Sequence, residues 1–205
     1  MSELRAYAFI DSMQPQYAAY VGATVQGDVP VAGMAELFVE MAPSNEIFPV
    51  ADAALKASGV RPATQFIERE FGLLEVHSFD PEEVKSAGRA ILDYLGVSEE
   101  DRLKPVVASS QVITNVDPYQ AQLINKFRRG SLLVPGRTLL VMEVFPAAYA
   151  GFAANEAEKS AHIDIVYVAN AGRYGRLFLS GTEADILTAR DAATTALESV
   201  TGRQA

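Results

Sequence analysis

The chain has no cysteine, and this absence excludes several kinds of chemistry. Disulfide bonds, thiol catalysis and cysteine-ligated iron–sulfur clusters are ruled out, and a reducing cytosol is a fitting environment. The chain also lacks an apolar run of about 18 residues, the length that a membrane-spanning helix needs. At the N-terminus no basic segment is followed by an apolar one, so we expect no signal peptide.

Positive charge is scarce as well. There are 17 Lys and Arg residues against 26 Asp and Glu residues, which gives a net charge of −9. An acidic chain without a Lys/Arg run is repelled by a phosphate backbone, so we expect no nucleic-acid partner. With 49% hydrophobic and 21% charged residues, the composition is that of an ordinary folded globular protein.

Motifs for nucleotide, metal or cofactor binding are missing too. There is no G-x-x-x-x-G-K-[ST] phosphate loop and no G-x-S-x-G elbow, and His77 and His162 are not spaced as metal ligands are. We therefore expect no metal and no cofactor. One enzymatic alternative remains open, because the strand residues Glu40 and Glu143 could do acid/base work together with His77. The favoured interpretation of the two carboxylates is one structural residue copied by duplication.

What the chain does have is a copy of itself. Shifted by 103 residues, its two halves align without a gap for nearly their whole length. Glycines and prolines matter most in this alignment, because they fix special backbone geometry. We predict two tandem domains, residues 1–102 and 103–205, with the same turns in the same order. The identities include Pro15/Pro118, Gly27/Gly130, Gly33/Gly136, Glu40/Glu143, Pro43/Pro146, Lys56/Lys159 and Gly72/Gly175.

Strand and helix patterns alternate within each copy, which predicts an α+β fold of tandem ferredoxin-like units. Asp80 is expected to cap the clearest helix, with Glu83 completing a capping box and Gly96 following its end. A turn and short hairpin are expected from Gly27 to Gly33. Strands are predicted at 5–11, 36–41, 61–70, 72–77, 106–114, 138–144, 164–169 and 175–181, and helices at 16–24, 46–57, 80–95, 118–127, 153–161 and 182–201.

The copies differ most informatively at one loop. Glu68-Arg69-Glu70 interrupts an otherwise apolar strand pair, and the second copy has Ala171-Gly172-Arg173 at the same place. The scaffold is therefore shared while one loop tip is specialised.

Several stretches resemble the shell proteins of bacterial microcompartments, the polyhedral protein-walled organelles that include carboxysomes and metabolosomes. More narrowly, the chain resembles the tandem-domain, trimer-forming type with circularly permuted domains, because a strand and a helix precede the segment 36–41 that would open an unpermuted domain. The resemblance covers essentially the whole chain. The stretches that carry it are YAFIDSMQPQYAA (7–19), ADAALKA (51–57), IEREFGLLEVH (67–77), DRLKP (101–105), YQAQLIN (119–125) and AANEAEK (153–159).

The resemblance implies a homotrimer shaped as a flat pseudohexagonal disc, single or stacked in pairs. Such discs tile with other shell proteins into a facet of a cytoplasmic microcompartment, and small metabolites cross a gated central pore. Lys56 matches the family's disc-edge lysine, and Lys159 corresponds to it by the repeat. Glu68 and Arg69 match the Glu-Arg pair that gates the pore. The whole pore loop is Glu68, Arg69, Glu70, Phe71 and Gly72.

A second function class also fits two ferredoxin-like units. A regulatory protein could bind a small molecule between its domains or subunits. Such a protein would form a discrete oligomer that never tiles.

Overall fold

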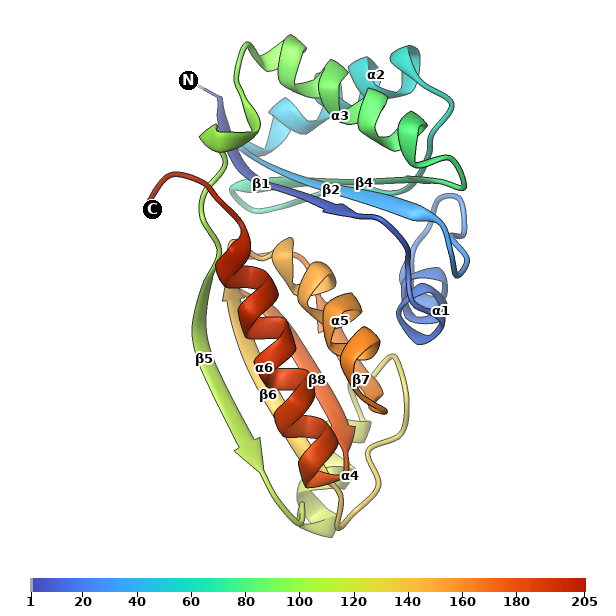
Figure 1. The fold of residues 1–205 in the computed structure, drawn as a ribbon, viewed down its shortest axis with the longest axis vertical. Helices are drawn as coiled ribbons and strands as arrows, with labels where there is room; N and C mark the ends of the chain where they lie inside the picture. Colours follow the sequence, from blue (N-terminus) through green and yellow to red (C-terminus); the bar gives the residue numbers. More distant parts are fainter. Residues whose placement is uncertain (1) are drawn as a thin grey trace.

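The computed structural model describes residues 2–205 and contains two four-stranded antiparallel sheets, one in each half (Figure 1). Their strand orders are β1-β2-β4-β3 and β5-β6-β8-β7. The first half contains β1 (Glu3–Ile10), α1 (Pro15–Thr24), β2 (Ala35–Ala42), α2 (Ile47–Ala57), β3 (Arg61–Glu68), β4 (Phe71–Ser78) and α3 (Pro81–Leu95). The second half contains β5 (Val106–Ile113), α4 (Pro118–Asn125), β6 (Thr138–Phe145), α5 (Tyr149–Ser160), β7 (Asp164–Ala169), β8 (Gly175–Gly181) and α6 (Glu183–Ser199).

The predicted duplication and α+β fold class are confirmed. Phe38 pairs with Glu75 in the first sheet, and their counterparts Val141 and Phe178 pair in the second. Gly33 and Gly136 share a left-handed backbone, with φ of 87° and 85°. The repeat loses one residue before the last helix, because the helix caps Asp80 and Thr182 lie 102 residues apart.

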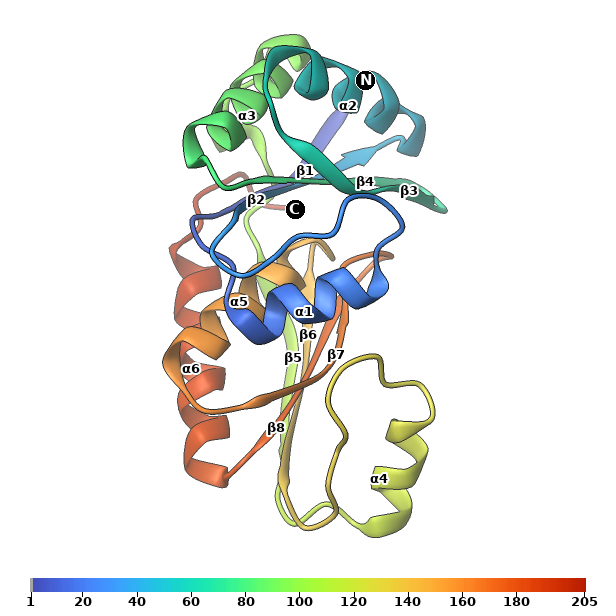
Figure 2. The same cartoon turned by 90° about the vertical axis from the view of Figure 1, so that its right-hand side faces the viewer.

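Each sheet carries its long helices on one face (Figures 1 and 2). Helices α2 and α3 cover one face of the first sheet and enclose an apolar core with it. Helices α5 and α6 cover one face of the second sheet. The other face of the first sheet rests on α5, so that one large core runs from β1 and β2 into the second half.

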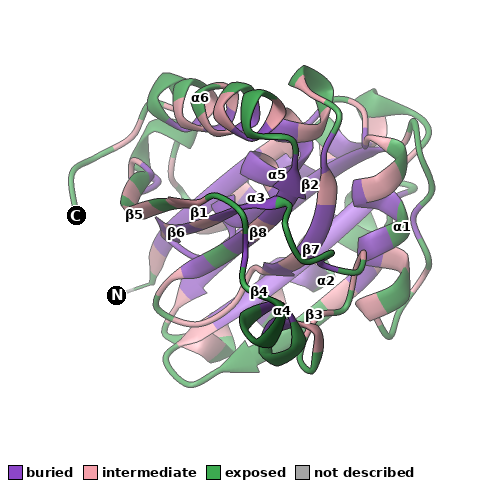
Figure 3. Ribbon diagram, turned by 90° about the horizontal axis from the view of Figure 1, so that it is seen from below, coloured by how far each residue is buried: buried purple, intermediate pink, exposed green. Residues whose placement is uncertain are grey.

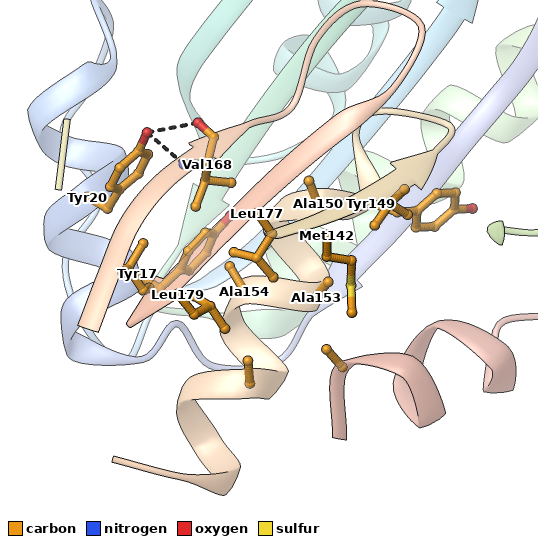
Figure 4. Close-up of a cluster of buried hydrophobic side chains, with 14 of the residues drawn as sticks. Tyr17, Tyr20, Met142, Tyr149, Ala150, Ala153, Ala154, Val168, Leu177 and Leu179 are labelled. Atoms are coloured by element: carbon orange, nitrogen blue, oxygen red, sulfur yellow. Dashed lines mark hydrogen bonds between the residues drawn. The ribbon is translucent and has the colours of Figure 1, made fainter. Parts of the chain in front are cut away.

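Helix α1 belongs to the first half in sequence but packs against β7 of the second (Figure 4). The Tyr20 hydroxyl accepts a hydrogen bond from the backbone N–H of Val168 and donates one to its carbonyl, each at 2.8 Å. The Glu158 carboxylate on α5 accepts from the backbone N–H groups of Gln16 and Tyr17, at 2.8 and 2.7 Å. The second half thus satisfies the donors that every helix start leaves unpaired.

Two local predictions were wrong. Glu83 does not complete a capping box, because its carboxylate accepts from the backbone N–H of Gly59 at 2.6 Å instead. Residues 27–33 form no hairpin; the N–H groups of Gly27 and Asp28 donate to carbonyls of β3, at Ala63 and Pro62. The rest of the predicted cap is confirmed, since the Asp80 carboxylate accepts from the N–H of Glu82 and the helix ends at a left-handed Gly96.

A buried acidic cluster lies between α1 and the first sheet. Glu36, Glu75 and His77 are each at most 1% exposed. The Tyr17 hydroxyl donates to Glu36 at 3.0 Å, and His77 Nδ1 lies 3.0 Å from Glu75. Burial and the neighbouring Glu75 carboxylate raise the pKa of Glu36 well above its ordinary value. Burial alone would lower the pKa of His77, but hydrogen bonds with Glu75 and Asp28 raise it.

This cluster makes stability depend on pH in a defined direction. The pKa of Glu36 is raised on folding. The contribution of this carboxyl group to the free energy of unfolding is therefore fully present below its pKa in the unfolded chain, and it is lost as the pH rises towards its pKa in the folded chain. Glu36→Gln keeps the shape, removes the charge and supplies an amide donor for Glu75. We expect the variant to raise the free energy of unfolding at pH 8 by about 1–3 kcal/mol and to leave it nearly unchanged at pH 4.5.

Urea denaturation at both pH values, at one protein concentration, measures the effect. Glu198→Gln on the exposed side of α6 is the matched control and should change neither value. Equal stabilisation of Glu36→Gln at both pH values, or destabilisation at pH 8, would contradict the assignment.

Candidate functional site

The β3–β4 hairpin forms the tip that the sequence singles out. Glu68 pairs with Phe71, so Arg69 and Glu70 form a two-residue turn. Arg69 has φ of 54°, a left-handed conformation, and its counterpart in the second half is Gly172 with φ of 97°. Glycine adopts this conformation freely, whereas another residue pays about 1–2 kcal/mol for it. An arginine retained at this position points to a role for its side chain.

The charged side chains of the tip extend into solvent. The Arg69 side chain is 91% exposed, and its Nε lies 3.8 Å from a carboxylate oxygen of Glu68, whose side chain is 48% exposed. An exposed pair of this kind contributes about 0–1 kcal/mol. The two groups are therefore close enough to interact and free enough to separate.

A hollow of about 860 Å³ lies between the two loop tips and the ends of β1 and β6. Phe71 forms part of its wall, and the Arg5 guanidinium lies 3.8 Å from the centre of that ring. Arg5, Phe145 and Arg173 also line the hollow, and none of them is among the pore residues expected from the sequence. No pattern in the sequence indicates their proximity, because these residues come together only when the two halves fold against each other.

Gly72 has a packing role inside β4 and does not lie at the tip. A Cβ atom there would lie 2.3 Å from the Ser44 carbonyl oxygen and 2.6 Å from Ile47 Cβ. Gly175 has the same constraint, because its Cβ would lie 2.2 Å from the Ala147 carbonyl oxygen. Of the predicted loop, Glu68, Arg69 and Glu70 are thus exposed, Phe71 stacks below Arg5, and Gly72 lets the strand pass close to α2.

The two predicted edge lysines differ in their surroundings. The Lys56 side chain is 75% exposed, and its Nζ lies 2.7 Å from Asp52, one helical turn away. The Lys159 side chain is 30% exposed, with its Nζ 2.9 Å from Asp11 and 2.8 Å from Glu156. Burial alone would lower the pKa of Lys159, but these two carboxylates raise it. Lys159 is held within the chain, whereas Lys56 projects from it.

The residues of the enzymatic alternative do not form one site. Glu40 accepts from Arg5 Nε at 2.7 Å and from the backbone N–H of Ala148 at 3.0 Å. It lies opposite Leu73 in the sheet, while His77 lies opposite Glu36 near the other end. Glu143 belongs to the second sheet, where it pairs with Arg176. Glu40 thus links the first sheet to the second half through its hydrogen bond with Ala148.

Residues 2–205 contain no cluster of three or more side chains suited to holding a metal ion. Within the same range, no helix has the length and apolar character to span a membrane.

Comparisons with known proteins agree with this architecture. Residues 4–101 match the family model of the CsoS1D N-terminal domain. The chain is 52% identical to the carboxysome shell protein CcmP of Synechococcus elongatus, over 98% of this chain and 95% of that protein. It is 43% identical to the carboxysome shell protein CsoS1D of Hydrogenovibrio crunogenus, over 99% of this chain and 100% of that protein.

Two solved structures share the whole fold. One is a fused permuted hexameric shell protein, MSM0275 of the RMM microcompartment, with a TM-score of 0.95, 43% identity and coverage of 98% of this chain and 100% of that one. The other is a double-ringed trimeric shell protein of the same microcompartment, MSM0271, with a TM-score of 0.96, 38% identity and full coverage of both chains.

These relatives are structural shell proteins rather than enzymes or ligand-binding regulators. Their identity and coverage extend over both halves of the duplicated, permuted fold. The chain therefore belongs to the CsoS1D family of tandem-domain carboxysome shell proteins, and it is a structural component of a bacterial microcompartment shell.

Proposed function

We propose that three copies of this chain form a pseudohexagonal ring that tiles into a shell facet and carries a gated pore for small metabolites. The two domains of each chain, residues 1–102 and 103–205, would alternate around the ring. The observation that carries the proposal is the pair of equivalent but unlike loop tips, with Arg69 at the position where the other half has Gly172. A ring of duplicated domains would bring three copies of each tip towards one axis.

The charges at the tip support gating. Three Glu68 and three Arg69 side chains would meet at the axis, where like charges about 4 Å apart repel by about 4 kcal/mol at an effective dielectric constant near 20. Alternation of Glu68 with Arg69 removes this repulsion and closes the pore. Rotation of the side chains into water opens the pore. Because an exposed ion pair contributes little stabilising free energy, both the open and the closed state can be populated. Arg69 at the mouth favours anionic metabolites.

The native mass tests the ring. The chain has a mass of 22.1 kDa, so we expect a species of three times that mass, or six times if two rings stack as in the double-ringed relative. Native mass spectrometry with negative-stain imaging of the same sample should show hexagonal discs. A monomer or a twofold dimer that forms no disc would contradict the proposal.

Arg69→Gly tests the gate. This variant introduces glycine, the residue that the second half has at the corresponding left-handed position, Gly172. The fold should therefore be retained, and backbone strain of about 1–2 kcal/mol should be relieved. Without Arg69 the three Glu68 carboxylates lose their counter-charges, so we expect more rings with an open pore. Classification of single-particle images measures the open fraction. Arg190→Ala on α6 is the control, and an open fraction equal to that of the native chain would contradict the gate.

Lys56→Ala tests the proposed disc edge. The exposed Lys56 can reach a neighbouring disc, so its loss should abolish two-dimensional sheets while leaving the ring mass unchanged. Sedimentation of sheets and electron microscopy measure tiling. Lys159→Ala is the paired comparison, and it should reduce tiling less, because Lys159 is already bound by Asp11 and Glu156. Undiminished tiling of Lys56→Ala would exclude this lysine from the edge.

A further inference from the structure

The two surfaces that meet between the halves each have a counterpart in the repeat, and these counterparts are not covered within one chain. We call the contact of α1 and the first sheet with α5 and β7 the internal seam. By the repeat, α4 corresponds to α1, while α2 and β3 correspond to α5 and β7. Figure 2 shows α4 at the far end of the second half and α2 and β3 in the first half, so these counterparts do not meet within one chain.

The uncovered counterparts carry exposed apolar side chains at seam positions. Tyr119 and Leu123 on α4 are 78% and 61% exposed, and Phe48 on α2 is 49% exposed. Their counterparts Gly151 and Tyr20 are buried, and Gln16 is half-buried. Figure 3 shows α4 mostly in the colour of exposed residues. A groove of about 470 Å³ along residues 62–66 of β3 lies where α4 would dock by analogy with α1.

Exposed apolar residues outside the seam behave differently. Val29 and its counterpart Leu132 are 57% and 54% exposed, and Val31 and Val134 are both 46% exposed. These positions remain uncovered even where the internal seam has formed. Exposure at these positions is thus the same in both halves, whereas Tyr119, Leu123 and Phe48 are exposed at positions that the internal seam covers in the other half.

We propose that a second copy of this chain covers these surfaces, with α4 of one copy docked on β3 and α2 of the next as α1 docks on β7 and α5 within a chain. The inference rests on the ring proposed above and assigns the residues that close it. Such a head-to-tail contact uses two different surfaces, as a closed ring requires.

The first support is an exchange of hydrogen-bonding groups. The Gln16 side chain accepts from the backbone N–H of Ile165 and donates to the carbonyl of Ile163 at 2.7 Å. The counterpart of Ile165 is Pro62, which has no N–H to donate. The counterpart of Gln16 is Tyr119, which has no amide and offers an apolar ring. The backbone donor at position 165 and the side-chain acceptor at position 16 are therefore both absent from the counterpart surfaces.

The second support is an exchange of volume. A Cβ atom on Gly151 would lie 2.5 Å from the Tyr17 hydroxyl and 3.0 Å from Phe38, so the internal seam requires glycine there. In the proposed seam Phe48 replaces Gly151, and the smaller Val141 replaces Phe38. The bulk has moved from one side of the contact to the other, as close packing demands.

The third support is an exchange of helix caps. Gln14 gives α1 no side-chain cap, and Glu158 supplies one from across the internal seam. Helix α4 has its own cap, because Asp117 accepts from the backbone N–H of Tyr119 at 2.8 Å. The counterpart of Glu158 is accordingly the apolar Leu55.

The exchanges make each seam complementary to itself and mismatched to the other. Tyr119 against Ile165 would leave a buried N–H unpaired, and Phe48 against Phe38 would overpack. The chain thus specifies the alternating order of its halves around the ring by excluding wrong pairings as well as by favouring the right ones.

A rescue experiment tests the pairing of Tyr119 with Pro62. Tyr119→Gln removes the aromatic ring, and Pro62→Ile creates an unpaired N–H, so each should raise the ring dissociation constant at least tenfold. Together they recreate the Gln16–Ile165 pair across the chains, so the double variant should regain most of the lost affinity. Leu132→Gln, which lies outside the seam, should leave the dissociation constant unchanged. Circular dichroism checks that each variant is folded.

The outcomes separate this inference from the ring itself. If the native chain forms no ring, the proposed function fails. If the native ring forms but neither single variant weakens it, or the double variant is as weak as the sum of the two, the pairing is wrong. Because the chain has no cysteine, Tyr119→Cys with Pro62→Cys gives a second measurement. Disulfide-linked oligomers on a non-reducing gel are expected, and monomers alone would overturn the proposal.

Discussion

The fold depends on the contact of the first sheet with α5. Glu40 reaches across it to the backbone N–H of Ala148, and Glu158 reaches back to the first turn of α1. Without α5, the first sheet would expose Phe38 and leave the buried Glu40 one partner short, which is costly for a buried charge. The two halves are therefore domains by sequence and topology, but they are joined through one continuous core.

The duplication has preserved the backbone and altered the side chains that meet across it. Gly33 and Gly136 retain the same left-handed turn, and Gly72 and Gly175 both allow a close backbone approach. The acidic cluster, by contrast, exists in one half only, since the counterparts of Glu36 and Glu75 are Leu139 and Phe178. The glycines that define the backbone were kept, whereas Glu36 and Glu75 were not.

This division explains what the sequence could predict. Glycine and proline at a constant offset predicted the duplication and most elements, because they act through local geometry. The cap at Asp80 was predictable for the same reason, whereas Glu83 binds Gly59, 24 residues away in sequence. Contacts between halves were not predictable, since nothing local in Gln16 or Glu158 indicates a partner more than 140 residues away. The lining of the hollow by Arg5, Phe145 and Arg173 was missed for the same reason.

The different chemistry of the two seams has a physical reason. Halves joined by a peptide chain meet at a high effective concentration, so the internal seam can add directional hydrogen bonds from Gln16, Tyr20 and Glu158 to its apolar core. Separate copies must also offset the translational and rotational entropy lost on association. Burial of apolar area supplies free energy without demanding hydrogen-bond geometry, and Tyr119, Leu123 and Phe48 provide that area. A duplicated chain that closes into a ring thus favours additional hydrogen bonds beside the apolar core within each copy, and additional apolar area between copies.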